Sequence, residues 1–177
     1  MKKLGFLFLL LLVGFSLKAT DQEPEQLSYN GEILYFGIGV ENDSPLSLSP
    51  YTIRTNEFNY SPTTSLKRGF VGCWIIRNDS LFLTHVLNTT FDKVPLDQAL
   101  AVGDATRPIF ASWYTGMLRP PFPVSDLPGC YIGVYQGQVA FFIKKTGDVT
   151  ENISESPELM KKLKDYLDQR KRGLVLE

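Results

Sequence analysis

The chain has 177 residues, of which 44% are hydrophobic and 12% aromatic, and its formal net charge at pH 7 is −1. This length and composition predict one folded domain and exclude an intrinsically disordered chain, because the apolar residues suffice to build a core. The lack of a basic excess argues against a general nucleic-acid-binding protein.

The N-terminus has the pattern of a secretory signal peptide. Lys2 and Lys3 precede an apolar run at residues 4–17, and the small residue Ala19 marks the expected cleavage site. The run is short for a transmembrane helix, although an uncleaved anchor is the alternative. Cleavage removes three lysines and no acid, so the 18 basic residues fall to 15 against 19 acidic ones, a net charge of −4. We expect an exported mature protein, periplasmic or secreted, without a membrane span.

The segment after the cleavage site divides into a leader and the start of the fold. Residues 20–28 are polar and predict a disordered leader, which leaves residues 29–177 as a single β-rich domain. Asn30-Gly31 is a turn signal, and the apolar run at 33–40 predicts a buried strand. A short edge strand is expected near residues 52–54.

The most informative stretch is residues 64–87. Two apolar runs, 69–77 and 80–87, flank Asn78-Asp79, which tolerates the left-handed backbone of a two-residue hairpin turn. Both faces of this hairpin are mostly apolar, so we expect it in the middle of a sheet that is covered on both sides. A two-residue turn sets the pairs Ile76–Leu81, Trp74–Leu83, Gly72–His85 and Phe70–Leu87 on one face, and Ile75–Phe82, Cys73–Thr84 and Val71–Val86 on the other.

The second half of the chain predicts shorter elements in a definite order. They are a short helix at 95–102 that Gly103 ends, a strand at 107–118, a proline-rich extended loop at 119–129, a hairpin of strands 130–135 and 139–145 around Gln136-Gly137, and a polar linker at 147–154.

A C-terminal amphipathic helix completes the pattern. Ser156, Pro157 and Glu158 follow the expected order of cap, first-turn proline and first-turn acid. The apolar stripe comprises Leu159, Leu163, Tyr166 and Leu167. The predicted fold class is therefore α+β: a mainly antiparallel β-sheet of about five to seven strands with the C-terminal amphipathic helix packed on it.

The central hairpin resembles one in small uncharacterised exported bacterial proteins. The residues that carry the resemblance are Arg68, Gly69, Phe70, Trp74, Ile76, Leu81 and Leu83, together with a second element at Ala111–Gly116. The resemblance implies a shared hairpin, and it implies no activity and no functional residue.

Candidate site residues are few. The single histidine, His85, is predicted opposite Gly72, either packed on aromatic side chains or lining a pocket that the glycine leaves open. Trp113 and Phe122 are the other candidate binding residues. The prolines around Phe122 predict a rigid connection between two strands, a polyproline ligand or a segment that closes a pocket. One histidine and no paired carboxylates indicate no catalytic residues, no metal site and no cofactor.

The two cysteines, Cys73 and Cys130, leave two states open. An exported chain with an even number of cysteines favours a disulfide, whereas Cys73 in mid-strand is typical of a buried thiol. A Cys73–Cys130 bridge is thus an alternative, and two buried thiols are the prediction.

The sequence favours an exported, non-enzymatic interaction or ligand-binding domain, whose partner is a protein or small ligand of the cell envelope. Two alternatives stay open. One is an inhibitor or immunity-type protein, which a protruding charged loop at 92–104 would favour. The other is an enzyme with a loop-built site near His85, which perturbed carboxylates close to that histidine would favour.

Overall fold

A computed structural model of the chain describes residues 23–36, 44–54, 66, 68–101, 107–119, 129–146 and 149–172, with 145–146 and 149–154 described by their backbone alone. The predicted signal peptide with Ala19 and residues 120–128 of the proline-rich loop, which include Phe122, lie outside the described residues. The strands are β1 (Glu25–Tyr29), β2 (Glu32–Phe36), β3 (Val71–Arg77), β4 (Ser80–Leu87), β5 (Lys93–Val94), β6 (Ile109–Phe110), β7 (Gly116–Leu118), β8 (Cys130–Tyr135), β9 (Gln138–Thr146) and β10 (Val149–Glu155), and the helices are α2 (Leu96–Ala99) and α3 (Pro157–Lys171).

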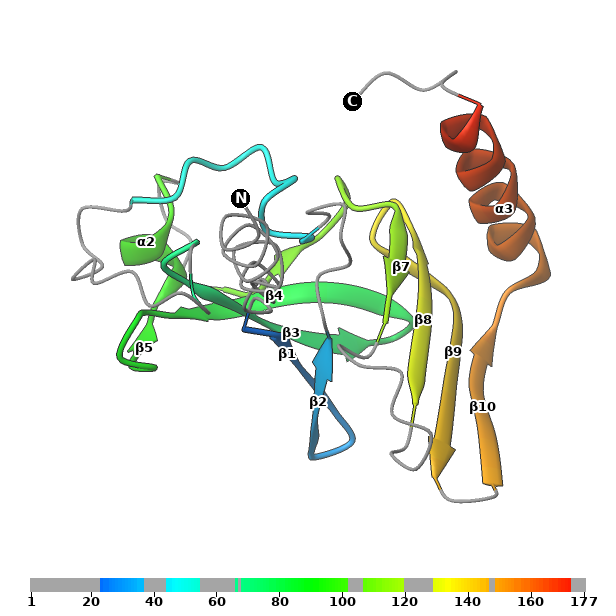
Figure 1. The fold of residues 1–177 in the computed structure, drawn as a ribbon, viewed down its shortest axis with the longest axis horizontal. Coiled ribbons are helices and arrows are strands. Elements are labelled where there is room, and N and C mark those ends of the chain that lie inside the picture. The colour runs from blue at the N-terminus through cyan, green and yellow to red at the C-terminus, as the bar shows by residue number, and fades with distance from the viewer. Residues whose placement is uncertain are drawn as a thin grey trace, which may run out of the picture.

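The fold is α+β, with a mostly antiparallel sheet and the C-terminal helix packed on it, which confirms the predicted fold class (Figure 1). Among the described residues the sheet has ten strands in the order β2-β1-β3-β4-β9-β8-β7, with β10 beside β9. This exceeds the expected five to seven because several strands have only two or three residues. Helix α3 lies against β8 and β9.

The sheet consists of two halves that meet at the tips of two hairpins (Figure 1). One half is β2-β1-β3-β4 with the short β5 and β6, and the other is β7-β8-β9-β10. Within the described residues, β4 and β9 pair only at Ser80 and Gln138. Two backbone hydrogen bonds reinforce this junction: Leu81 N donates to Gly137 O at 2.8 Å, and Val139 N donates to Asp79 O at 2.7 Å.

The central hairpin is confirmed for its turn and for the half of its register next to the turn. Asn78 and Asp79 have φ of 48° and 53°, the left-handed conformation that a two-residue turn of this kind requires. The observed pairs there are Ile76–Leu81, Ile75–Phe82 and Trp74–Leu83.

Beyond Trp74 the predicted register is wrong by one residue. Cys73 pairs with His85, Gly72 with Val86 and Val71 with Leu87, so Thr84 is the extra residue of a β-bulge. The Thr84 hydroxyl donates to the carbonyl oxygen of Cys73 at 2.8 Å, which satisfies this acceptor inside the bulge. His85 therefore lies opposite Cys73 and not opposite Gly72.

The N-terminal strands correct two predictions. Residues 25–28, which were expected in a disordered leader, belong to β1, and β1 pairs in parallel with β3. The turn at Asn30 and Gly31 is confirmed by φ values of 49° and 84°. However, β2 is largely exposed rather than buried, since among the described residues it pairs with β1 alone.

Four later predictions also change. The expected strand at 107–118 is interrupted by a turn at 112–113, which separates β6 from β7. The expected polar linker at 147–154 contains most of β10, which pairs with β9. The helix at 95–102 is shorter than predicted and comprises only α2, whose Leu96 and Ala99 are buried. The strand expected near 52–54 is reduced to one bridge between Ile53 and Leu100.

Helix α3 begins as predicted. Ser156 is its N-cap and accepts a hydrogen bond from Leu159 N at 3.4 Å, and Pro157 occupies the first helical position. Of the predicted stripe, Leu163 is fully buried, while Leu159, Tyr166 and Leu167 are half-buried. Leu163 packs over Gly133 of β8, where a side chain would collide with it.

The main core lies between the sheet and the segment 44–54, which runs above β3 and β4 in Figure 1. Its largest buried members include Leu46, Leu83, Tyr114 and Phe142. A second, smaller cluster on the opposite face of the sheet contains Leu66, Val71, Cys73 and Leu87. In the part of the chain that the structure describes, no helix has the length and apolar character to span a membrane.

Candidate functional site

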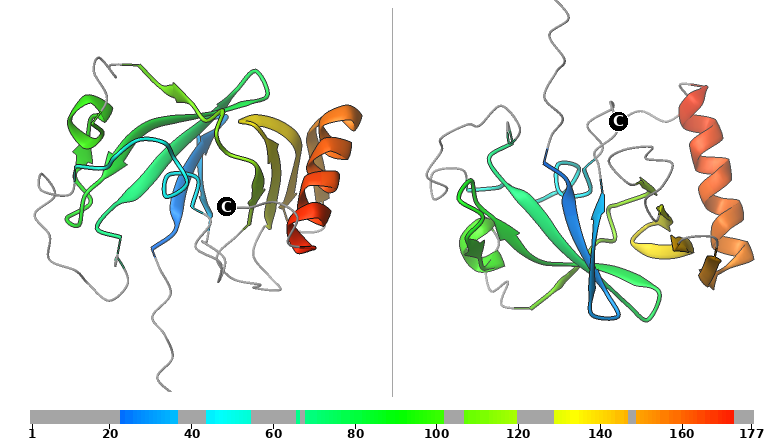
Figure 2. Two further views of the ribbon diagram at one scale, coloured as in Figure 1. Left: turned by 90° about the horizontal axis from the view of Figure 1, so that it is seen from above. Right: turned by 60° about the horizontal axis from the view of Figure 1, so that its bottom comes forward.

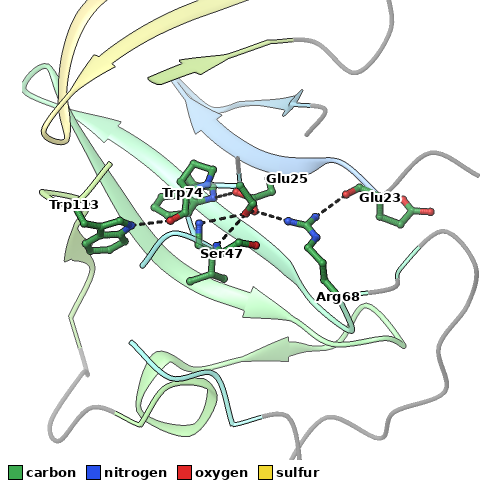
Figure 3. Close-up of polar contacts among 9 residues, drawn as sticks. Glu23, Glu25, Ser47, Arg68, Trp74 and Trp113 are labelled. Carbon is green, nitrogen blue, oxygen red and sulfur yellow. Dashed lines mark hydrogen bonds and ion pairs between the residues drawn. The ribbon is translucent and has the colours of Figure 1, made fainter. Parts of the chain in front are cut away.

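A buried carboxylate is the most unusual polar feature of the described chain. Glu25, on β1, is 3% exposed. Its Oε1 accepts hydrogen bonds from Ser44 Oγ and from Arg68 Nη1, the latter at 2.9 Å. Its Oε2 accepts one from Trp74 Nε1 at 2.5 Å (Figure 3). Arg68 Nη2 also donates to the carbonyl oxygen of Glu23 at 3.0 Å.

The electrostatics of this cluster follow from its burial. Desolvation raises the pKa of Glu25 above its ordinary value, against the opposing effects of the Arg68 charge and of the hydrogen bonds from Ser44, Trp74 and Arg68. Burial also lowers the pKa of Arg68, which the charge of Glu25 opposes. Arg68 Nε is buried without a hydrogen-bond partner among the described residues.

The arrangement around Glu25 fits a structural role better than a catalytic one. Both carboxylate oxygens already accept hydrogen bonds from side chains of this chain, and no substrate can reach a group this buried without opening the fold. Through Glu25 the cluster joins β1 to Ser44, to Arg68 and to Trp74 of β3. The space is full, because a Cβ on Gly72 would lie 2.8 Å from Trp74 Nε1 and 3.1 Å from Glu25 Oε2.

Trp113, a predicted binding residue, lies beside this cluster, where it is half-buried and packs against the main core. Its Nε1 donates to the carbonyl oxygen of Pro45 at 2.7 Å (Figure 3), and its ring packs edge-on against Tyr51 with a centroid distance of 5.3 Å. The ring of Trp74 lies at 6.5 Å. The polar partners of Trp113 are therefore supplied by the fold itself.

His85 lies on the opposite face of the sheet from Glu25. It shares a face with Cys73 and Gln26, whereas Glu25 shares the other face with Leu27 and Trp74. Thr84 Oγ1 is 2.9 Å from His85 Nδ1. Partial burial, and then the charge of Lys93, lower the pKa of His85. The sequence thus located the histidine on the central hairpin, but among the described residues the structure brings neither Trp113 nor a carboxylate with a perturbed pKa to it.

Both cysteines are buried and free. Burial raises the pKa of Cys73 to about 12, and it also raises that of Cys130. The two residues lie on β3 and β8, which β4 and β9 separate in the sheet. Such thiols are weak nucleophiles, because the thiolate is the reactive form. Across the described residues, no three His, Cys, Asp or Glu side chains gather where a metal ion could be held.

The outer face of the first half-sheet, the face turned away from the main core, carries a partly exposed apolar row. The cross-strand register aligns one residue from each of five strands, and we call these the outer row: Ile33, Ser28, Ile75, Phe82 and Phe110. Ile33 is 56% exposed and Phe110 is 36% exposed, while Ile75 and Phe82 are half-buried. The Phe82 and Phe110 rings lie 5.6 Å apart. With strands about 4.8 Å apart, the row spans about 19 Å.

The outer row corrects the prediction that the central hairpin is covered on both faces. At the end away from the turn, Val71, Cys73 and Leu87 of its outer face are buried in a cluster with Leu66, but the face opens toward the turn at Ile75 and Phe82. In the right panel of Figure 2, β1 to β4 cross the molecule with α3 beside them rather than over them.

A groove lies where the two halves meet α3. We call it the junction groove, and its volume is about 310 Å³. The residues that line it are Phe110, Ser112, Tyr135, Gln136, Gln138, Leu159 and Lys162. Phe110 ends the outer row and also lines this groove. Sequence reasoning missed both surfaces, because each is assembled from strands that are distant along the chain.

Comparison with protein-family models, with curated proteins and with solved structures finds no match to this chain.

Proposed function

We propose that the chain is an exported, non-enzymatic binding domain that recognises a partner through the outer row. The observation that carries the proposal is that Ile75, Phe82 and Phe110 follow one another on neighbouring strands of one partly exposed face, with Ile33 in the same row beyond Ser28 of β1. Scattered apolar side chains on a surface are ordinary, whereas a contiguous apolar patch is typical of an interaction site.

The positions of the titratable groups favour binding over catalysis. An enzyme site near His85 would need a carboxyl or a nucleophile beside the imidazole. The carboxyl with a raised pKa, Glu25, lies on the other face of the sheet and accepts three hydrogen bonds from side chains of the fold. Cys73 shares the face of His85, but its raised pKa keeps it as a thiol near neutral pH.

Photo-crosslinking in the source cells tests the interaction. The residue p-benzoylphenylalanine is placed at Ile33, which is 56% exposed in the outer row, or at Leu48, which is 48% exposed in the segment over the inner face. We expect a discrete crosslinked product from position 33 and none from position 48. Ile75→Asp in the same chain should weaken the product from position 33, because it places a charge within the row. Equal products from both positions, or none from either, would contradict the proposal.

Export has its own test. The pattern of Lys2, Lys3, the apolar run and Ala19 supports a mature protein that begins at Thr20. N-terminal sequencing of native material should return Thr20, and a chain that still begins at Met1 would show that no cleavage occurs.

A further inference from the structure

The junction groove is walled by three separate parts of the fold. Leu159 and Lys162 come from the first two turns of α3 and, three residues apart, share a helix face. Tyr135, Gln136 and Gln138 come from the tip of the β8–β9 hairpin. The remaining wall is Phe110, the last residue of β6, and Ser112, two residues further along the chain.

Backbone hydrogen bonds hold these three parts in place. Gly137 N donates to Tyr114 O at 2.9 Å, and Gln136 N donates to Thr115 Oγ1 at 2.9 Å. Gly137 has a φ of +78° and lies so close to Ala111 that a Cβ would be 2.7 Å from the Ala111 carbonyl oxygen. The first turn of α3 is tied to β9, because Ser156 N donates to Ala140 O at 2.9 Å. The groove is thus largely preformed, which lowers the entropic cost of binding a ligand.

The groove lining combines apolar, neutral polar and charged side chains. Phe110, Tyr135 and Leu159 offer apolar surface, and the serine and the two glutamines offer neutral hydrogen-bonding groups. Lys162 is the one charged residue of the lining. Its Nζ lies 2.8 Å from Glu158 Oε1, but this pair is exposed, at 48% and 79%, so a ligand can replace Glu158 at little cost.

We propose that the junction groove binds a small aromatic carboxylate, with its ring between Phe110, Tyr135 and Leu159 and its carboxylate at Lys162. A volume of about 310 Å³ lies at the lower end of the range of small-molecule sites, roughly 300–1,000 Å³, which suits a single ring with a short polar extension. The positive charge of Lys162 selects an anion, and the glutamine side chains orient its polar groups. This site is separate from the use of the outer row, apart from the shared Phe110.

The test compares two ligands that differ only in charge. N-acetyl-L-phenylalanine and its uncharged amide are titrated into the purified mature protein and followed by ¹⁵N–¹H NMR spectra. Both should shift the signals of Gln136 and Gln138, and the carboxylate should bind about two- to five-fold more tightly, the range of an exposed ion pair. In Lys162→Met the two ligands should bind equally, whereas Lys161→Met, which alters the neighbouring exposed lysine outside the groove, should keep the preference.

Further variants keep the outcomes distinct. Ser112→Trp fills the groove and should abolish the binding of both ligands, while Ile33→Asp should alter neither affinity. The proposal is overturned if the amide binds as well as the acid to the wild type. It is also overturned if both lysine variants behave alike, or if the shifted signals lie away from the groove. If no partner crosslinks at the outer row while the ligands still bind, the proposed function fails and the junction-groove proposal stands.

Discussion

Leu163 of α3 rests directly on the backbone of Gly133 in β8: a Cβ added to the glycine would lie 2.6 Å from Leu163 Cδ2. The same atom would also collide with the ring of Phe141. Helix α3 is therefore held at a distance from the sheet that only a glycine permits.

Gly133→Ala should destabilise the protein by about 1–3 kcal/mol, as overpacking of a well-filled interior does. Denaturant unfolding measures the loss. The control is Gly129→Ala, where the added Cβ would lie an ordinary 3.4 Å from Tyr131 and the midpoint should hardly move. Equal midpoints for the two variants would show that α3 can shift away without cost.

Arg68→Met should cost about 3–5 kcal/mol, because it leaves the buried Glu25 carboxylate without its compensating charge. The double variant Glu25→Gln/Arg68→Met should recover most of this loss, since no uncompensated charge remains. Lys162→Met removes an exposed pair and should leave the unfolding midpoint within error. An Arg68→Met midpoint equal to that of wild type would show that the buried pair contributes nothing.

Trp74→Ala should cost about 3–5 kcal/mol, the usual range for deleting a large aromatic side chain from a core. Most domains have only about 5–15 kcal/mol of stability, so we expect poor expression or partial unfolding. Trp74→Phe keeps a ring and removes only the hydrogen bond to Glu25, so its cost should be smaller, about 1–3 kcal/mol. A Trp74→Phe loss as large as that of alanine would assign the whole effect to the hydrogen bond.

The lowered pKa of His85 predicts a loss of stability on acidification. The folded protein binds this proton less readily than the unfolded chain, whose histidine titrates near 6.5. The contribution is therefore complete above pH 6.5 and falls as the pH drops from there toward the lower pKa of the folded state. Unfolding midpoints of wild type and His85→Gln, measured from pH 7.5 to 5.5, should diverge as the pH falls. Parallel curves would place His85 in full contact with solvent.

Both thiols should be unreactive toward a thiol reagent in the folded protein and reactive after denaturation. Cys73 and Cys130 are buried, and the pKa of Cys73 is raised to about 12, so little thiolate exists at pH 8. Titration of protein denatured without reductant should find two thiols per chain. Finding none in a monomeric chain would reveal a Cys73–Cys130 disulfide, whose formation would require β3 and β8 to approach each other.

The elements with local signals could be predicted from the sequence, and those that depend on distant partners could not. Asn78-Asp79 and Gln136-Gly137 encode their turns in two residues, and Ser156-Pro157 encodes the start of α3. The bulge at Thr84 was not predicted, because the apolar pattern of the two strands does not reveal an inserted residue or its hydrogen bond to the Cys73 carbonyl. Strand β1 was not predicted because residues 20–28 are mostly polar, although Leu27 and Tyr29 alternate with polar residues as in a strand.

The candidate surfaces follow the same division. His85 could be placed on the central hairpin but not on a face, because the bulge sets which side it occupies. The Glu25 cluster needs Ser44 and Arg68, which are 19 and 43 residues further along the chain. The outer row and the junction groove require the register of several strands at once, and a single sequence does not contain that information.

The parallel pairing of β1 with β3 has a consequence for the order in which the chain assembles. The two-residue hairpins β3–β4 and β8–β9 close locally and need no distant segment, so they can form within microseconds. Strand β1 is synthesised before the other described strands, yet the hydrogen bond of Glu25 cannot form until Trp74, 49 residues later, is present. Closing that long loop costs more entropy than closing a hairpin, which places the docking of β1 late in folding. The carboxylate then stays hydrated until the hairpin that will bury it is already built.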